Sequence, residues 1–135
     1  MQYSLKKSEI LKSKKRFQEI FARGEKFRGR VIQCILILHE PAQGQGRAKV
    51  KVGFSVRRSV RNAVDRNRIK RLMKESYRLN QNILHDAIQR FSPSLELIFL
   101  YTPSLQKPFS LPSYTEVEGD VKLLLDKIIE SRIGY

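Results

Sequence analysis

Acidic side chains are scarce in this 135-residue sequence compared with basic ones. Thirteen Asp and Glu stand against twenty-seven Lys and Arg, which leaves a formal net charge of +14 at pH 7. A charge of this sign and size says little about the fold, but it does indicate the kind of partner. Nucleic acid is the first candidate, and an anionic membrane surface is the second.

Long apolar runs and paired cysteines are also missing. The longest apolar runs, at 34–38 and 97–101, are far too short to span a bilayer, and the charged N-terminal segment lacks the apolar stretch of a signal peptide. The single cysteine, Cys34, has no partner for an intramolecular disulfide, which favours a packing role in a reducing compartment. We therefore expect a cytoplasmic protein without membrane association, built as one domain over residues 1–135.

The side-chain sets that would support catalysis by the protein itself are not found either. His39 and His85 have no carboxylate or second His at a useful spacing, and Asp65 and Glu75 on a basic segment are interpreted as charge balance. There is no Gly-rich phosphate loop, no zinc spacing of Cys and His, and no Ser-His-Asp set. The sequence predicts neither catalytic residues nor a metal site in the protein.

The apolar periodicity predicts an α+β fold in which one small sheet packs with helices. A helix is expected from the N-cap Ser13 to about Arg23, with Gly24 after it. Strands are expected at 31–38, 49–56 and 95–101, and helices at 62–80, 82–91 and 114–133. The alternation in KVKVGFSV predicts a half-buried antiparallel strand, joined to the strand before it as a hairpin by the loop PAQGQGRA.

The stretch VDRNRIKRLMKESYR, residues 64–78, combines dense positive charge with helical apolar spacing. A helical wheel separates the two patterns into opposite faces. The apolar face consists of Ile69, Leu72, Met73, Ser76 and Tyr77, and the polar face of Asn67, Lys70, Arg71, Lys74 and Arg78. Arg66 falls near the apolar face, and its orientation stays open.

The positive charge of this region is too dense to be neutralised within the helix. From Arg57 to Arg78, nine bases stand against two acids, so ion pairs along the helix cannot balance the surface. A polyanion partner therefore explains the pattern better than a merely solvated face. The preceding strand argues against a helix-turn-helix and the small apolar face against a membrane surface, so structured RNA is favoured.

The block GFSVRRSVRNAVDRNRIKRLMKESYR, residues 53–78, closely resembles the signature of the bacterial ribonuclease P protein component. It contains a strand ending in GxSV, a basic turn, and the RNR motif Arg66-Asn67-Arg68. The segment LKSKKRFQEIFARG is similar to the first helix of that family. The resemblance implies a single-domain α-β sandwich with a small mixed sheet, related to the second domain of a small-subunit ribosomal protein. It also implies a left-handed crossover through the RNR helix and a fourth short strand between Gly24 and Val31.

The resemblance further implies a protein subunit that assists removal of the 5′ leader from precursor tRNA. The catalyst would be the large RNA subunit, which would hold most of the Mg²⁺. A cleft lined by Phe17, Phe21 and Ser55 would receive the single-stranded leader. No protein oligomer is expected. The residues implied to contact the catalytic RNA are Arg57, Arg58, Arg61, Asn62, Arg66, Asn67, Arg68, Lys70, Arg71, Lys74 and Arg78.

The sequence departs from the family pattern at three places. Arg61 stands where a glycine is usual, an aliphatic residue near Leu36 replaces a cleft aromatic, and the loop 102–113 with three prolines is longer than usual. Phe17 and Phe21 are also compatible with a plain core role. Two other functions remain open: a non-catalytic ribosomal or RNA-assembly binding protein of the same fold, and a stand-alone protein nuclease.

Overall fold

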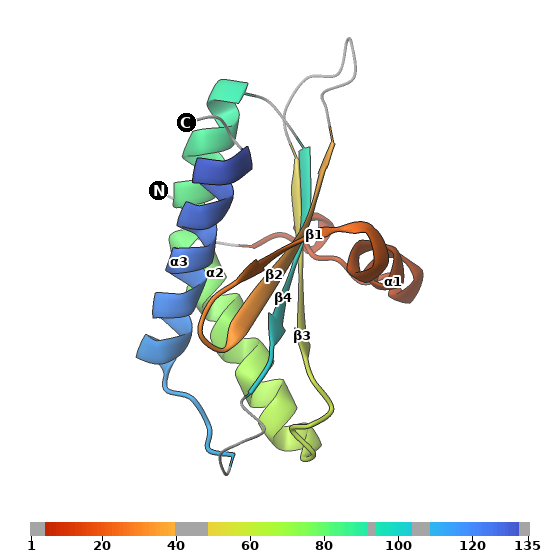
Figure 1. Ribbon diagram of the computed structural model, residues 1–135, viewed down its shortest axis with the longest axis vertical. Coiled ribbons are helices and arrows are strands. Elements are labelled where there is room, and N and C mark those ends of the chain that lie inside the picture. The colour runs from red at the N-terminus through yellow and green to blue at the C-terminus, as the bar shows by residue number, and fades with distance from the viewer. Residues whose placement is uncertain (1–4, 40–48, 92–93, 104–108, 133–135) are drawn as a thin grey trace.

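The computed structural model describes residues 5–39, 49–91, 94–103 and 109–132, which form a mixed α+β fold around one four-stranded sheet (Figure 1). Helices α2 and α3 lie side by side on one face of the sheet, and α1 lies on the other (Figure 1). The elements in chain order are η1 (Lys7–Glu9), α1 (Lys14–Arg23), β1 (Glu25–Arg28), β2 (Ile32–His39), β3 (Val50–Val56), α2 (Ala63–Phe91), β4 (Ser94–Tyr101) and α3 (Tyr114–Arg132).

The strands are arranged in the order β1-β2-β4-β3, with β1 as the expected fourth short strand. The predicted hairpin between residues 31–38 and 49–56 is wrong, because β4 lies between β2 and β3. The antiparallel pairing predicted for KVKVGFSV is wrong as well, since β3 runs parallel to β4 with Val50 opposite Leu95. The alternation in this strand reports which side chains are buried, and it is the same for either direction of pairing.

Helix α2 continues through the position where the sequence predicts a break, so the prediction of two helices at 62–80 and 82–91 is wrong. The polar run there keeps its helical geometry because its side chains find partners. Asn80 Nδ2 donates to Ser76 O at 2.8 Å and to Glu118 Oε2 on α3 at 3.1 Å. The buried Gln81 donates from Nε2 to Arg78 O at 3.1 Å.

Two apolar clusters lie on the two faces of the sheet. The larger cluster fills the space under α2 and α3, where the rings of Phe54, Tyr77 and Phe99 contact one another. Cys34 is completely buried in this cluster, and burial raises the pKa of its thiol, which fits the predicted packing role. Leu36 is only 3% exposed in the same cluster, so it faces the helices and does not replace a cleft aromatic.

The smaller cluster lies under α1 and consists of Leu11, Ile20, Ile35, Ile98 and Leu100, with Phe17, Phe21 and Ile37 at its border. Helix α1 begins as predicted, with Ser13 Oγ accepting from Arg16 N at 3.2 Å. Gly24 follows the helix in an extended conformation, with φ −74°. A Cβ atom at Gly24 would lie 2.5 Å from Ile35 Cγ2, so close packing against β2 requires glycine here.

Candidate RNA-binding surface

The two predicted faces of α2 are confirmed by the exposure of its side chains. Ile69, Met73, Ser76 and Tyr77 are buried, and Leu72 is half-buried against the same cluster. The exposed positions between Arg66 and Arg78 are Asn67, Arg68, Lys70, Arg71, Lys74 and the single acid Glu75. Burial and charge are therefore separated around one helix, and the cationic face is open to a partner.

Arg78 ends this cationic face and is only partly available. Its guanidinium Nε donates to Glu75 Oε2 at 3.0 Å, and Nη2 donates to Glu75 Oε1. The hydrogen bond from Arg78 lowers the pKa of the Glu75 carboxyl. Arg78 therefore offers a partner less free charge than the lysines do.

The turn between β3 and α2 is fixed by backbone hydrogen bonds while its basic side chains stay exposed. Arg57 N donates to Tyr101 O at 3.1 Å, and Val60 N donates to Arg57 O at 3.0 Å. Val60 is 1% exposed and anchors the turn in the larger cluster, whereas Arg57, Arg58 and Arg61 are all exposed. Three predicted RNA-binding arginines thus project from a rigid turn.

The orientation of Arg66, which the sequence leaves open, is toward this turn. Its Nη1 donates to Val60 O at 2.7 Å and to Arg61 O at 2.8 Å, and the side chain is half-buried. Asn62 complements it at the helix start, where its Oδ1 accepts from Val64 N at 2.8 Å. Asn62 and Arg66 both belong to the predicted RNA-binding set. In the structure they stabilise the turn and the start of α2.

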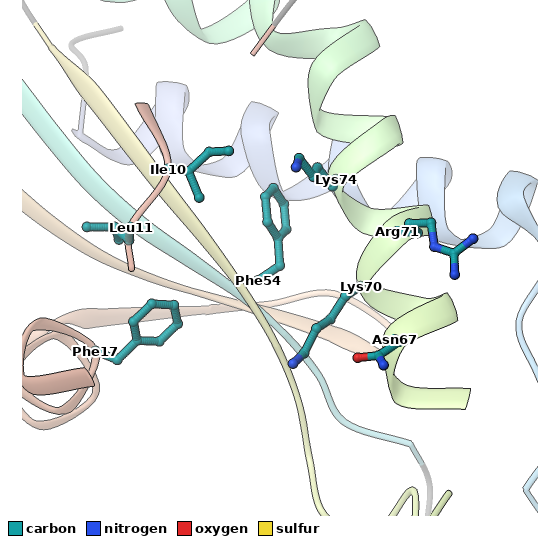
Figure 2. A pocket seen from close by; sticks show the side chains of 8 residues that line it. All are labelled: Ile10, Leu11, Phe17, Phe54, Asn67, Lys70, Arg71 and Lys74. Atoms are coloured by element: carbon teal, nitrogen blue, oxygen red, sulfur yellow. The ribbon is translucent and has the colours of Figure 1, made fainter. Parts of the chain in front are cut away.

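A groove of about 230 Å³ joins the cationic face of α2 to aromatic and apolar side chains. Figure 2 shows Phe17 from α1 on one side, the α2 residues on the other, and Phe54 from β3 between them. The lining residues are Ile10, Leu11, Phe17, Phe54, Asn67, Lys70, Arg71 and Lys74. Apolar surface for bases and positive charge for phosphates therefore meet in one place.

Of the three residues predicted for the leader cleft, the structure brings only Phe17 into this groove. Phe21 lies behind it, with ring centroids 6.3 Å apart, and Ser55 lies on the face of the sheet that carries α1. Sequence reasoning missed Phe54, which has the alternation of a core residue. Only the position of β3 at the edge of the sheet makes Phe54 accessible from the groove.

Phe17 lies directly on β3 because the strand has a glycine beneath its ring. A Cβ atom at Gly53 would lie 2.4 Å from Phe17 Cζ, far closer than van der Waals contact allows. The glycine of the GxSV pattern thus leaves the space into which the Phe17 ring packs.

An ion-pair cluster fixes the start of α1 to the sheet. Arg16 Nε donates to Glu96 Oε2 on β4 at 2.7 Å, and a second guanidinium nitrogen pairs with Glu19. His39 Nε2 lies 2.7 Å from Glu96 Oε1. The Arg16 hydrogen bond holds the pKa of Glu96 below its usual value. The Arg16 guanidinium thereby offsets the negative charge of this carboxylate on β4.

In the part of the chain that the structure describes, no three His, Cys, Asp or Glu side chains gather where they could hold a metal ion. Nor does any helix within the described ranges combine the length and the apolar character needed to cross a membrane.

The family assignment comes from comparison with known proteins. The family model described as Ribonuclease P matches residues 5–128. The chain belongs to the ribonuclease P protein family. Among curated ribonuclease P protein components, that of Chlorobaculum tepidum is 31% identical over 96% of this chain and 86% of its own length. That of Enterococcus faecalis is 31% identical over 96% and 98%, respectively.

Solved structures of ribonuclease P proteins share the fold. The protein from Thermotoga maritima superposes with a TM-score of 0.66 at 20% identity, covering 89% of this chain and 97% of that one. The protein from Staphylococcus aureus gives 0.62 at 18% identity, covering 95% and 100%. The fold expected from the resemblance is confirmed, including the helix that joins the parallel neighbours β3 and β4.

Proposed function

We propose that this ribonuclease P family chain is the protein subunit of a ribonucleoprotein that removes the 5′ leader from precursor tRNA. The observation that carries the proposal is the groove in which the Phe17 and Phe54 rings face exposed Lys70 and Lys74. Family membership and the names of the curated relatives support the same role.

The exposed face of α2 and the turn before it would bind the catalytic RNA. Their cations neutralise phosphates and fix the protein on the RNA without reading its sequence. The proposed contacts are Arg57, Arg58, Arg61, Asn67, Arg68, Lys70, Arg71 and Lys74. Asn62 and Arg66 hold the turn in shape, and Arg78 contributes at the edge through a side chain shared with Glu75.

The leader would bind along the edge of β3, partly in the groove. Its bases would stack on the exposed parts of Phe17 and Phe54, while its phosphates approach Lys70 and Lys74. Phe21 supports the Phe17 ring from behind, and Ser55 offers a hydroxyl on the neighbouring face of the strand. Stacking tolerates any base, so this part of the site would bind leaders of varied sequence.

Magnesium would be held mainly by the catalytic RNA, because the described part of this chain gathers no ligand set for it. Bound there, Mg²⁺ would activate water for attack on the phosphodiester and stabilise the developing charge. The protein would act by placing the substrate and by lowering phosphate repulsion, which reduces the Mg²⁺ concentration that the assembly requires.

The test is reconstitution of the chain with its cognate catalytic RNA and precursor tRNA at low Mg²⁺. We expect leader release well above the rate of the RNA alone. If about six phosphates are neutralised, the logarithm of RNA affinity should fall with the logarithm of salt concentration with a slope of roughly −5. Arg68→Ala and Arg71→Ala should weaken RNA binding without changing the melting temperature. Lys122→Ala, on the exposed side of α3, removes the same charge and serves as the control that should leave RNA binding unchanged.

The other outcomes would favour a different function or refute part of the proposal. RNA binding without stimulation of cleavage would favour a ribosomal or assembly protein of the same fold. Cleavage by the protein with no RNA subunit present would mean a stand-alone nuclease. A salt slope near zero would refute the electrostatic part of the proposal.

A further inference from the structure

The far edge of the sheet carries a second group of cations that the proposed function does not use. Lys26 and Arg28 on β1, Arg30 in the turn after it, and Arg23 at the end of α1 are all exposed. None of these four forms a salt bridge with an acid among the described residues. Strand β1 is the edge opposite β3, so this group is separate from the cationic face of α2.

The register of the sheet places the β1 cations on the same face as α1. Phe27 pairs with Cys34 and packs into the cluster under α2 and α3, so its neighbours Lys26 and Arg28 point the other way. One row of side chains then crosses all four strands on the α1 face: Arg28, Gln33, Leu100 and Ser55. The cationic edge is thereby connected with Ser55, beside the leader groove.

This row is suited to a flexible polyanion. Gln33 and Ser55 are half-buried polar side chains, while Leu100 between them is 7% exposed and forms the floor. Three strand spacings separate β3 from β1, a distance of about 14 Å. That corresponds to roughly four stacked nucleotides at about 3.4 Å each.

The connection between β1 and β2 is held rigid in spite of its exposed charges. The buried carboxylate of Asp120 on α3 accepts from the backbone N–H groups of Arg30 at 2.9 Å, Val31 at 2.7 Å and Ile32 at 2.9 Å. Lys127 Nζ donates to Arg28 O at 2.6 Å. The cations are therefore presented from a fixed turn, so the turn itself loses less conformational entropy when a ligand binds.

We propose that this turn, with Arg28 and Arg30 as its main contacts, is a second phosphate-binding site for the leader of precursor tRNA. The strand leaves the groove beside Phe17, crosses the row from Ser55 to Arg28, and is held at β1 by its 5′-distal phosphates. Single-stranded RNA is the occupant because the path combines exposed cations, which have no acidic partner among the described residues, with the half-buried polar side chains of Gln33 and Ser55. The inference rests on the proposed function, which places the leader at β3.

The test combines Arg28→Ala and Arg30→Ala with a series of leader lengths in the reconstituted holoenzyme. Each lost contact to single-stranded RNA should make the log–log salt slope about 0.7 shallower, which corresponds to about fivefold weaker binding at 0.1 M salt. We expect this loss only for leaders that fill the groove and extend at least about four nucleotides beyond it, far enough to reach β1. Precursors with short leaders should bind and react as with the unsubstituted protein.

Lys122→Ala provides the matched control, because it removes one exposed cation from α3, away from this face. Melting temperatures of all variants verify that the turn is intact. Equal losses for short and long leaders would place the two arginines on another RNA segment and overturn the proposal, as would no loss at all. Cleavage of the short-leader precursor by the unsubstituted holoenzyme tests the proposed function separately.

Discussion

The two faces of the sheet are built very differently. Twenty-two of the described buried residues form the cluster under α2 and α3, whereas five form the cluster under α1. The ten-residue helix α1 is held by this small cluster and by the pair between Arg16 and Glu96. Most of the apolar burial thus stabilises one face, which leaves the other open enough to carry the proposed leader path.

The largest expected effect comes from opening the larger cluster. Phe99→Ala removes a fully buried ring in contact with Phe54 and Tyr77, and should lower the free energy of unfolding by about 3–5 kcal/mol. Ile98→Ala, the next residue on the same strand, opens the cluster under α1 and should cost closer to about 2 kcal/mol. Urea denaturation measures both, and equal losses would contradict the unequal division of stability.

A smaller effect is expected where α3 holds the β1–β2 turn. Asp120→Ala leaves three backbone N–H groups without their acceptor, that of Ile32 in a buried position, and should cost about 2–3 kcal/mol. Asp126→Ala, on the exposed side of α3, should change stability by less than about 0.5 kcal/mol. Thermal unfolding distinguishes the two variants. If they are equally mild, the turn is not fixed by its carboxylate.

The pair that holds α1 should make its attachment sensitive to acid. Because the pKa of Glu96 is lowered in the folded protein, its contribution is fully present above the unfolded value of about 4.5 and is lost as the pH falls through the folded pKa. Glu96→Gln should therefore reduce stability near pH 7, with the difference shrinking below about pH 4.5. Chemical denaturation at several pH values measures this, and a difference independent of pH would exclude the ion pair as its source.

The smallest effect on stability is expected at Gly53, which lies under the Phe17 ring. A substitution there should also affect binding. Gly53→Ala forces the ring to move, since the new Cβ would lie 2.4 Å from Phe17 Cζ, at a stability cost of about 1 kcal/mol or less. Affinity for precursor tRNA should fall, while affinity for mature tRNA stays constant.

Gly119→Ala is the control for this substitution, because its added Cβ meets nothing within 4 Å. As a change in the middle of a helix, it should stabilise the protein by about 0.5–1 kcal/mol and leave both affinities unchanged. Unchanged precursor binding by Gly53→Ala would remove Phe17 from the proposed leader site.

Local patterns in the sequence predict most of the helices and strands and the two faces of α2. They do so because the spacing of apolar residues depends only on which side chains are buried. Local patterns do not predict the order of the strands. The expected hairpin joins β3 to the strand just before Lys49 in the sequence, whereas the true neighbour of β3 is β4, which follows α2 in the chain. The continuity of α2 through Gln81 also depends on a distant contact. The polar residues there are typical of a helix break, but Glu118 on α3 accepts a hydrogen bond from Asn80. Non-local pairing decides what local patterns leave open.

The candidate site divides in the same way. The basic face of α2 follows from the wheel, which also marks Arg66 as the exception. Its bonds to Val60 O and Arg61 O explain that position. The role of Phe54 in the groove and the polar row from Arg28 to Ser55 could not be predicted. Both depend on which strand lies at the edge and on the register across four strands.

The parallel pairing of β3 with β4 has a consequence for the order in which the molecule forms. Val50 and Leu95 are forty-five positions apart, and the whole of α2 is synthesised between the two strands. A nascent chain therefore carries β3 without its main partner until β4 has left the ribosome, and closing so long a loop is slow. The strand that bears Gly53, Phe54 and Ser55 joins the sheet only then. The groove and the row across the sheet are consequently among the last features of the protein to be completed.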